Sequence, residues 1–95
     1  MDKNTIPVAL FGLGAIVATP NALAHLAQDD ILNGIRRHRA GDWGDLDAHD
    51  RNVNESALLE GGRLVSVYHS GGGVKFYVIT EWDRSVTTVL LPEDY

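Results

Sequence analysis

Hydrophobic and polar positions repeat with two different periods along the chain, and the change of period separates helices from strands. Apolar side chains recur every three or four positions in the first half, which predicts helices over residues 20–27, 30–39 and 47–60. Apolar runs and strict alternation predict strands over 14–19, 63–69, 74–81 and 86–91. The order β-α-α-α-β-β-β is typical of an α+β fold, with a small, mainly antiparallel sheet packed by helices on one face.

Local signals mark the ends of several of these elements. Thr19 followed by Pro20 predicts an N-cap and a first helical turn, and Asp29-Asp30 is expected to cap the second helix after a kink. The glycine-rich segment Ser70–Gly73 permits positive φ and predicts a hairpin between two strands. Pro92 is expected to stop the last strand.

The apolar run from Ile6 to Val17 imitates the hydrophobic part of a secretory signal. However, Asp2 cancels the charge of Lys3, and the run is shorter than the about 20 residues that a membrane span needs. We therefore expect a single domain over 1–95, in which 1–12 is a loose lead-in before a buried strand. A cytoplasmic location without membrane contact follows, and secretion is the minor alternative.

The charge and composition of the chain argue against several classes of function. The 95 residues include 8 Lys and Arg against 13 Asp and Glu, for a formal net charge of −5. Nucleic-acid binding is disfavoured because phosphate neutralisation needs several clustered cations. The chain has no cysteine, and the spacing of its acidic residues and histidines fits neither a calcium loop nor a histidine metal site. We expect no metal and no cofactor.

Two tryptophans are the first candidates for a binding site. Trp43 and Trp82 each lie in a predicted polar turn, where an indole is either a lid on the core or an exposed anchor for a partner. The basic pair Arg36 and Arg37 precedes the acidic stretch 42–60, which adds a charged surface that could dock another protein. An unknown protein partner or self-association would fit this surface.

A second set of residues suggests catalysis instead. Arg63, His69, Arg84 and Thr87 lie on adjacent predicted strands and turns. A base that takes the 2′-hydroxyl proton of RNA, beside an arginine that stabilises the phosphorane, could cleave RNA without a metal. Threonine is also common in strands, and an Asp-Arg pair is common in turns, for structural reasons alone. RNA cleavage by these residues therefore stays the alternative hypothesis.

Two segments of the chain resemble one family. Gly41-Asp42-Trp43-Gly44 and the C-terminal run ITEWDRSVTTVLLPEDY (79–95) are similar to an uncharacterised family of small bacterial proteins called plasmid-related, and the similarity extends over 14–95. The resemblance implies an intracellular protein of a bacterial mobile element and implies no reaction. The order of elements is also similar to that of barnase–colicin–RelE-like toxin nucleases. We predict a non-enzymatic protein-interaction module, with a toxin-type ribonuclease as the alternative.

The predicted strands give a first test of the fold. Val78→Asp or Leu90→Asp should unfold the domain, because each places a carboxylate on a core strand at a cost comparable to the whole stability of a small domain. The loss of a cooperative thermal transition in circular dichroism would show this. A soluble variant that still melts cooperatively would mean that the strand faces are assigned wrongly.

Overall fold

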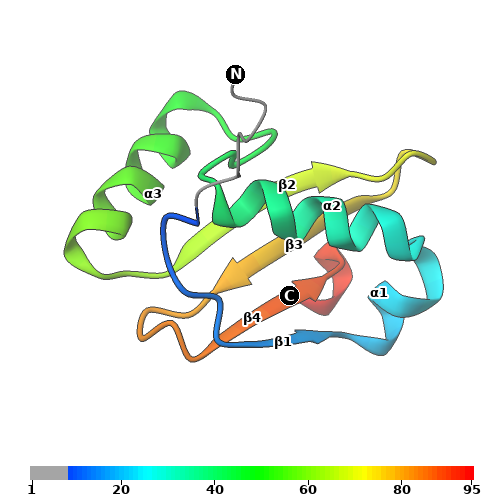
Figure 1. Cartoon of the computed structure of the whole chain (residues 1–95). Helices are drawn as coiled ribbons and strands as arrows, with labels where there is room; N and C mark the ends of the chain where they lie inside the picture. The colour runs from blue at the N-terminus through cyan, green and yellow to red at the C-terminus, as the bar shows by residue number, and fades with distance from the viewer. Residues whose placement is uncertain (1–8) are drawn as a thin grey trace, which may run out of the picture.

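The polypeptide forms a four-stranded sheet, with helices over one of its faces and beside one of its edges (Figure 1). A computed structural model describes residues 9–95. The predicted α+β fold and its element order are confirmed. In chain order the elements are β1 (Ala15–Ala18), α1 (Pro20–His25), α2 (Gln28–Arg39), α3 (Ala48–Glu60), β2 (Leu64–His69), β3 (Lys75–Thr80), β4 (Val86–Leu90) and the short 3₁₀ helix η1 (Pro92–Asp94).

The sheet has the strand order β1-β4-β3-β2, with β1 and β2 at its edges. Strands β2, β3 and β4 are antiparallel neighbours, whereas β1 runs parallel to β4, with Ala15 opposite Val86. The expectation that the first strand is buried is wrong, since Ile16 and Val17 are 52% and 46% exposed. An apolar run shows that a strand is hydrophobic, but it does not show how many neighbours the strand has.

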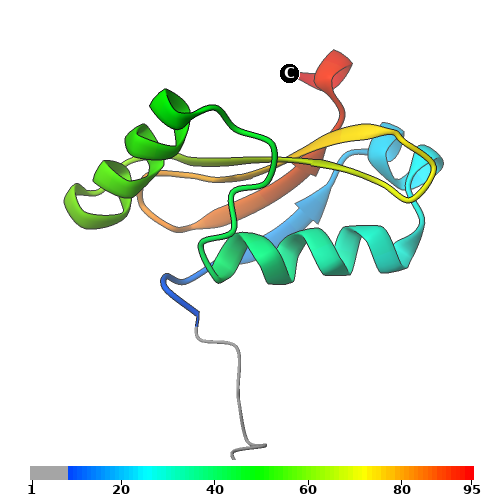
Figure 2. The same cartoon turned by 90° about the horizontal axis from the view of Figure 1, so that it is seen from above.

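Helices α1 and α2 pack on one face of the sheet, which Figure 2 shows with α2 below the strands. The strand alternation predicted over 63–69 and 74–81 is confirmed, because alternate side chains of β2 and β3 are buried in this core. Gly34 lets α2 approach closely, since a Cβ there would lie 2.9 Å from the ring of Phe76. The buried cluster consists of Ala22, Leu26, Tyr68, Phe76, Val78, Val89 and Leu91.

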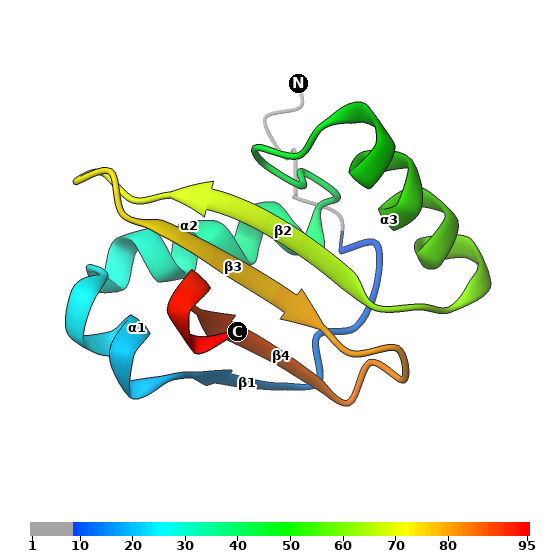
Figure 3. The ribbon, with the colours of Figure 1, turned by 180° about the vertical axis from the view of Figure 1, so that it is seen from behind.

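Helix α3 departs from the expected packing on one face. It lies beside the edge strand β2 (Figure 3). Its residues Asp50, Val53 and Asn54 line a groove over the opposite face of the sheet. Its anchor is polar: the Asn54 amide donates to the Val65 carbonyl at 2.8 Å and accepts from the Val65 amide at 3.1 Å. Val53 on this helix is half exposed.

The helix ends follow the sequence signals in part. The Thr19 hydroxyl accepts a hydrogen bond from the Ala22 amide, which confirms the predicted N-cap of α1. The cap expected from Asp29-Asp30 is wrong, because α2 begins after Ala27, whose side chain makes no capping bond. Both aspartates lie in the first turn of α2, where their charges favour the positive end of the helix dipole.

A row of buried polar side chains crosses the core from α2 to β4. The His38 ring binds the Ser66 hydroxyl through Nδ1 at 2.6 Å and the Thr80 hydroxyl through Nε2 at 2.9 Å. Thr80 contacts the Thr87 hydroxyl at 2.6 Å, and Thr87 donates to the carbonyl of Leu13 at 2.7 Å. We call these five residues the His38 row.

The direction of every bond in the His38 row follows from its last member. A carbonyl only accepts, so Thr87 donates its proton to Leu13, Thr80 donates to Thr87, and the Nε2–H of His38 donates to Thr80. In a neutral imidazole Nδ1 is then the acceptor for the Ser66 hydroxyl. The row therefore requires a proton on Nε2.

The surroundings of His38 oppose its protonation. Burial, and secondarily the charge of Arg84, lowers the pKa of His38 from its ordinary value of 6.5 to about 4. Phe11 and Trp43 both meet the imidazole edge to face, with ring centroids 5.2 and 5.8 Å away. Folding consequently favours the neutral ring, and stability must depend on pH.

The sign of that dependence follows from the lowered pKa. The unfolded chain binds a proton at His38 more readily, so the stabilisation is complete above pH 6.5 and falls as the pH drops to about 4. The loss should total roughly 3 kcal/mol over this window, measured by urea unfolding at a series of pH values. His38→Gln, whose amide can still accept from Ser66 and donate to Thr80, should lose this dependence. The matched exposed variant His49→Gln should keep it, and equal pH dependence in both variants would contradict the assignment.

Candidate functional site

A groove lies over the second face of the sheet, between α3 and the C-terminal residues. Its floor is apolar because the outward positions of β2 and β3 alternate with the core positions. The groove has a volume of about 320 Å³. Its lining residues are Leu46, Asp50, Val53, Asn54, Arg63, Val65, Val67, Tyr77, Ile79 and Tyr95. A shallower hollow continues it toward β4 and shares Arg63, Ile79 and Tyr95, with Glu81, Thr88, Leu90 and Asp94 added.

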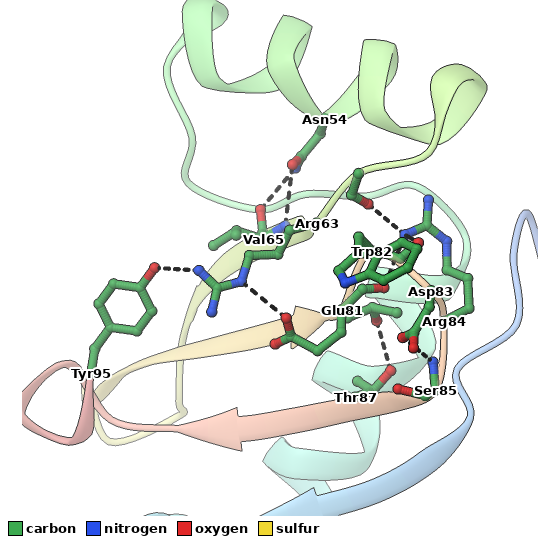
Figure 4. A network of polar contacts seen from close by, with 12 residues as sticks. Asn54, Arg63, Val65, Glu81, Trp82, Asp83, Arg84, Ser85, Thr87 and Tyr95 are labelled. Carbon is green, nitrogen blue, oxygen red and sulfur yellow. Dashed lines mark hydrogen bonds and ion pairs between the residues drawn. The ribbon is translucent and has the colours of Figure 1, made fainter.

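Arg63 lies where the groove and its extension meet (Figure 4). Its Nε is 3.6 Å from a carboxylate oxygen of Glu81, and one terminal nitrogen donates to the Tyr95 hydroxyl at 2.9 Å. The guanidinium also lies 5.6 Å from the centre of the Tyr95 ring. The charge of Arg63 is thus already matched by Glu81, which leaves the other charged groups of the groove to set its potential.

Those remaining groups are acidic. Asp50 on α3 and Asp94 on η1 line the groove and its extension, so carboxylates outnumber the single arginine. Asp94 accepts from the Thr19 hydroxyl at 2.6 Å, and chiefly for this reason its pKa lies below the ordinary value. The groove therefore combines an apolar floor with an anionic rim at neutral pH.

The groove is lined by both apolar and polar side chains. No serine, threonine or lysine is among its described lining residues, and the Asn54 amide binds the backbone of Val65 through both its nitrogen and its oxygen. Across residues 9–95, no group of three or more His, Asp or Glu side chains is placed to hold a metal ion. A Ser66–His38 contact does exist, but both side chains are fully buried and out of reach of a substrate.

The structure resolves the alternatives for the two tryptophans. Trp43 is 3% exposed, covers the His38 row and donates through its indole N–H to Glu55 at 2.7 Å, so it is a lid on the core. Trp82 is 70% exposed in the β3–β4 turn, directly after the groove residue Glu81. Only Trp82 has the exposure that an interaction anchor needs.

The two arginines of the basic pair on α2 also differ in their surroundings. Arg37 forms a two-point ion pair with Asp42, at 2.6 and 3.2 Å, and its guanidinium lies 4.5 Å above the ring of Tyr68. The ion pair holds the pKa of Asp42 below its usual value. Arg37 is thus engaged within the fold, whereas Arg36 is exposed and donates to Asn33 one turn earlier.

The four residues considered for RNA cleavage do not assemble. Arg63 precedes β2 and His69 ends it, so the length of the strand separates them, and His69 pairs with Asp45 at 2.7 Å. Thr87 is fully buried in the His38 row. Arg84 is bound to backbone carbonyls. No common point exists at which these side chains could meet one phosphate.

Arg84 instead joins α3 to the β3–β4 turn (Figure 4). One terminal nitrogen donates to the carbonyls of Gly62 and Glu81, and the other donates to Ala57 at 3.1 Å. This supplies a cation to the C-terminal end of α3, whose own last turn has none. The residue adopts a φ of 62°, which side chains rarely tolerate, so these bonds hold a strained backbone.

Comparison with known proteins adds no information about function. No protein-family model matches the chain, and no curated protein or solved structure matches it either. Within residues 9–95, no helix is long and apolar enough to cross a membrane. Any function must therefore be argued from the site itself.

The difference in burial between Trp43 and Trp82 predicts different effects of their removal on stability. Trp43→Ala should lower the free energy of unfolding by about 3 to 5 kcal/mol, because it opens a cavity over the His38 row. Trp82→Ala should change it by less than about 0.5 kcal/mol, as is usual for an exposed position. Urea unfolding of both variants measures the difference. Equal losses of stability would show that Trp82 also belongs to the core.

Proposed function

We propose that the chain is a non-enzymatic protein-interaction module whose groove binds a segment of a partner protein. The observation that carries this proposal is an apolar floor bounded by carboxylates and opened to solvent between α3 and η1. Such concave apolar sites with a few polar groups are where proteins bind ligands. The exposed indole of Trp82 offers an aromatic anchor just beyond Glu81.

The charge of the groove selects the chemistry of its partner. The charge of Arg63 is matched by that of Glu81. Asp50 and Asp94 therefore leave the rim of the groove negative, and the chain as a whole has a formal net charge of −5. A segment with apolar side chains flanked by Lys or Arg fits both the floor and the rim. A nucleic acid backbone or an acidic peptide would be repelled.

The cellular setting of this module is proposed on the resemblance alone. The plasmid-related family to which 14–95 is similar implies an intracellular accessory protein of a bacterial mobile element. No observation in the structure favours the ribonuclease alternative, since its candidate residues lie apart and Thr87 is buried.

Selection from a displayed random peptide library tests the proposal. Enriched peptides should combine Leu, Ile or Phe with Lys or Arg, and their binding should weaken as salt increases. Val53→Lys should reduce their affinity at least about tenfold, because it adds a cation inside the groove. Isothermal titration calorimetry measures the affinity.

The control variant lies on the same helix. Leu59→Lys makes the same chemical change at an exposed position outside the groove, and it should leave the affinity unchanged. A library that yields no basic apolar peptides would overturn the proposal. Equal weakening by both variants would show that net charge, and not the groove, governs binding.

A further inference from the structure

The two edges of the sheet differ in how their outward backbone groups are covered. At the β2 edge, Asn54 occupies both backbone groups of Val65, as described above. The next outward residue, Val67, donates to the Trp43 carbonyl at 3.1 Å and accepts from the Asp45 amide at 2.8 Å. This edge is therefore blocked against pairing with another strand.

At the β1 edge the outward groups are left open. The Ala15 and Thr19 amides donate to β4, at the carbonyls of Ser85 and Val89. Alternation in a parallel ladder then directs the amide and carbonyl of Ile16 and Ala18 away from β4. Among the described residues, no strand or helix lies beyond this edge (Figures 1 and 3).

The β1 edge also lacks the side chains that discourage pairing. From residue 9 to residue 28 the chain contains no Asp, Glu, Lys or Arg, and the large exposed side chains of β1 are those of Ile16 and Val17. Charge and proline are the usual protections of an edge strand, and β1 has neither. Two copies of a chain with a net charge of −5 would repel each other least along this uncharged stretch.

We propose that β1 pairs antiparallel with β1 of a second copy, joining two sheets into one. The two-fold axis passes beside Ile16, because a hydrogen-bonded antiparallel pair needs two residues with outward backbone groups opposite each other. The Ile16 residues of the two copies exchange two hydrogen bonds. The isoleucine side chains then lie side by side and lose their exposure to water.

Amide exchange followed by NMR tests this pairing. A strand of four residues buries little surface, so we expect a weak dimer that forms as the concentration rises. On going from dilute to millimolar protein, exchange at the Ile16 amide should slow markedly. Exchange at the Ala15 amide, which is already bonded within the sheet, should change little. Concentration-independent exchange at Ile16 would overturn the proposal.

Sedimentation of matched variants gives the second readout. Ile16→Lys places two like charges at the axis and should abolish the dimer, whereas Leu59→Lys on α3 makes the same change away from β1 and should preserve it. A dimer that persists in folded Ile16→Lys would assign self-association to another surface. Amide exchange in the wild-type protein tests the proposed β1 pairing even if Ile16→Lys fails to fold.

Discussion

The hydrogen bonds of His38 hold the architecture together. Its imidazole links α2 to β2 and β3, and through Thr87 the same row continues to β4 and to the segment before β1. The Thr80 and Thr87 hydroxyls both donate and accept along it. An apolar residue at any of its four polar positions would therefore leave a neighbour unsatisfied in the core. Apolar packing fills the space around this row, but the row fixes the lateral position of the helix on the sheet.

The His38 row and the helices α1 and α2 occupy one face of the sheet, and the other face is left open. Because α1 and α2 complete the core on their own side, α3 needs only to hold the β2 edge, which it does through Asn54. Arg84 of the β3–β4 turn binds the C-terminal end of α3. The apolar residues on the second face of β2 and β3 are consequently covered only in part, by α3 and Tyr95. The groove is the space that this arrangement leaves.

The sequence predicts the elements well, because alternation in the strands and capping signals such as Thr19 are local. It predicts the site poorly, because the groove depends on where α3 lies, and an amphipathic pattern does not specify a neighbour. Trp43 and Trp82 illustrate the difficulty: both follow polar turn residues, yet one covers His38 and the other faces solvent. His38 itself carries no signal in the sequence, since its partners lie on strands far along the chain.

The parallel pairing of β1 with β4 has a consequence for how the protein is made. Residues 15–18 are synthesised before the strand that pairs with them, which is complete only when Leu90 has been added. Until then the apolar β1 segment has neither a partner nor a finished core, since Thr87 and Val89 are also missing. Pairing of β1 is thus delayed until β4 has been synthesised, and the nascent chain must keep this apolar strand from aggregating until then.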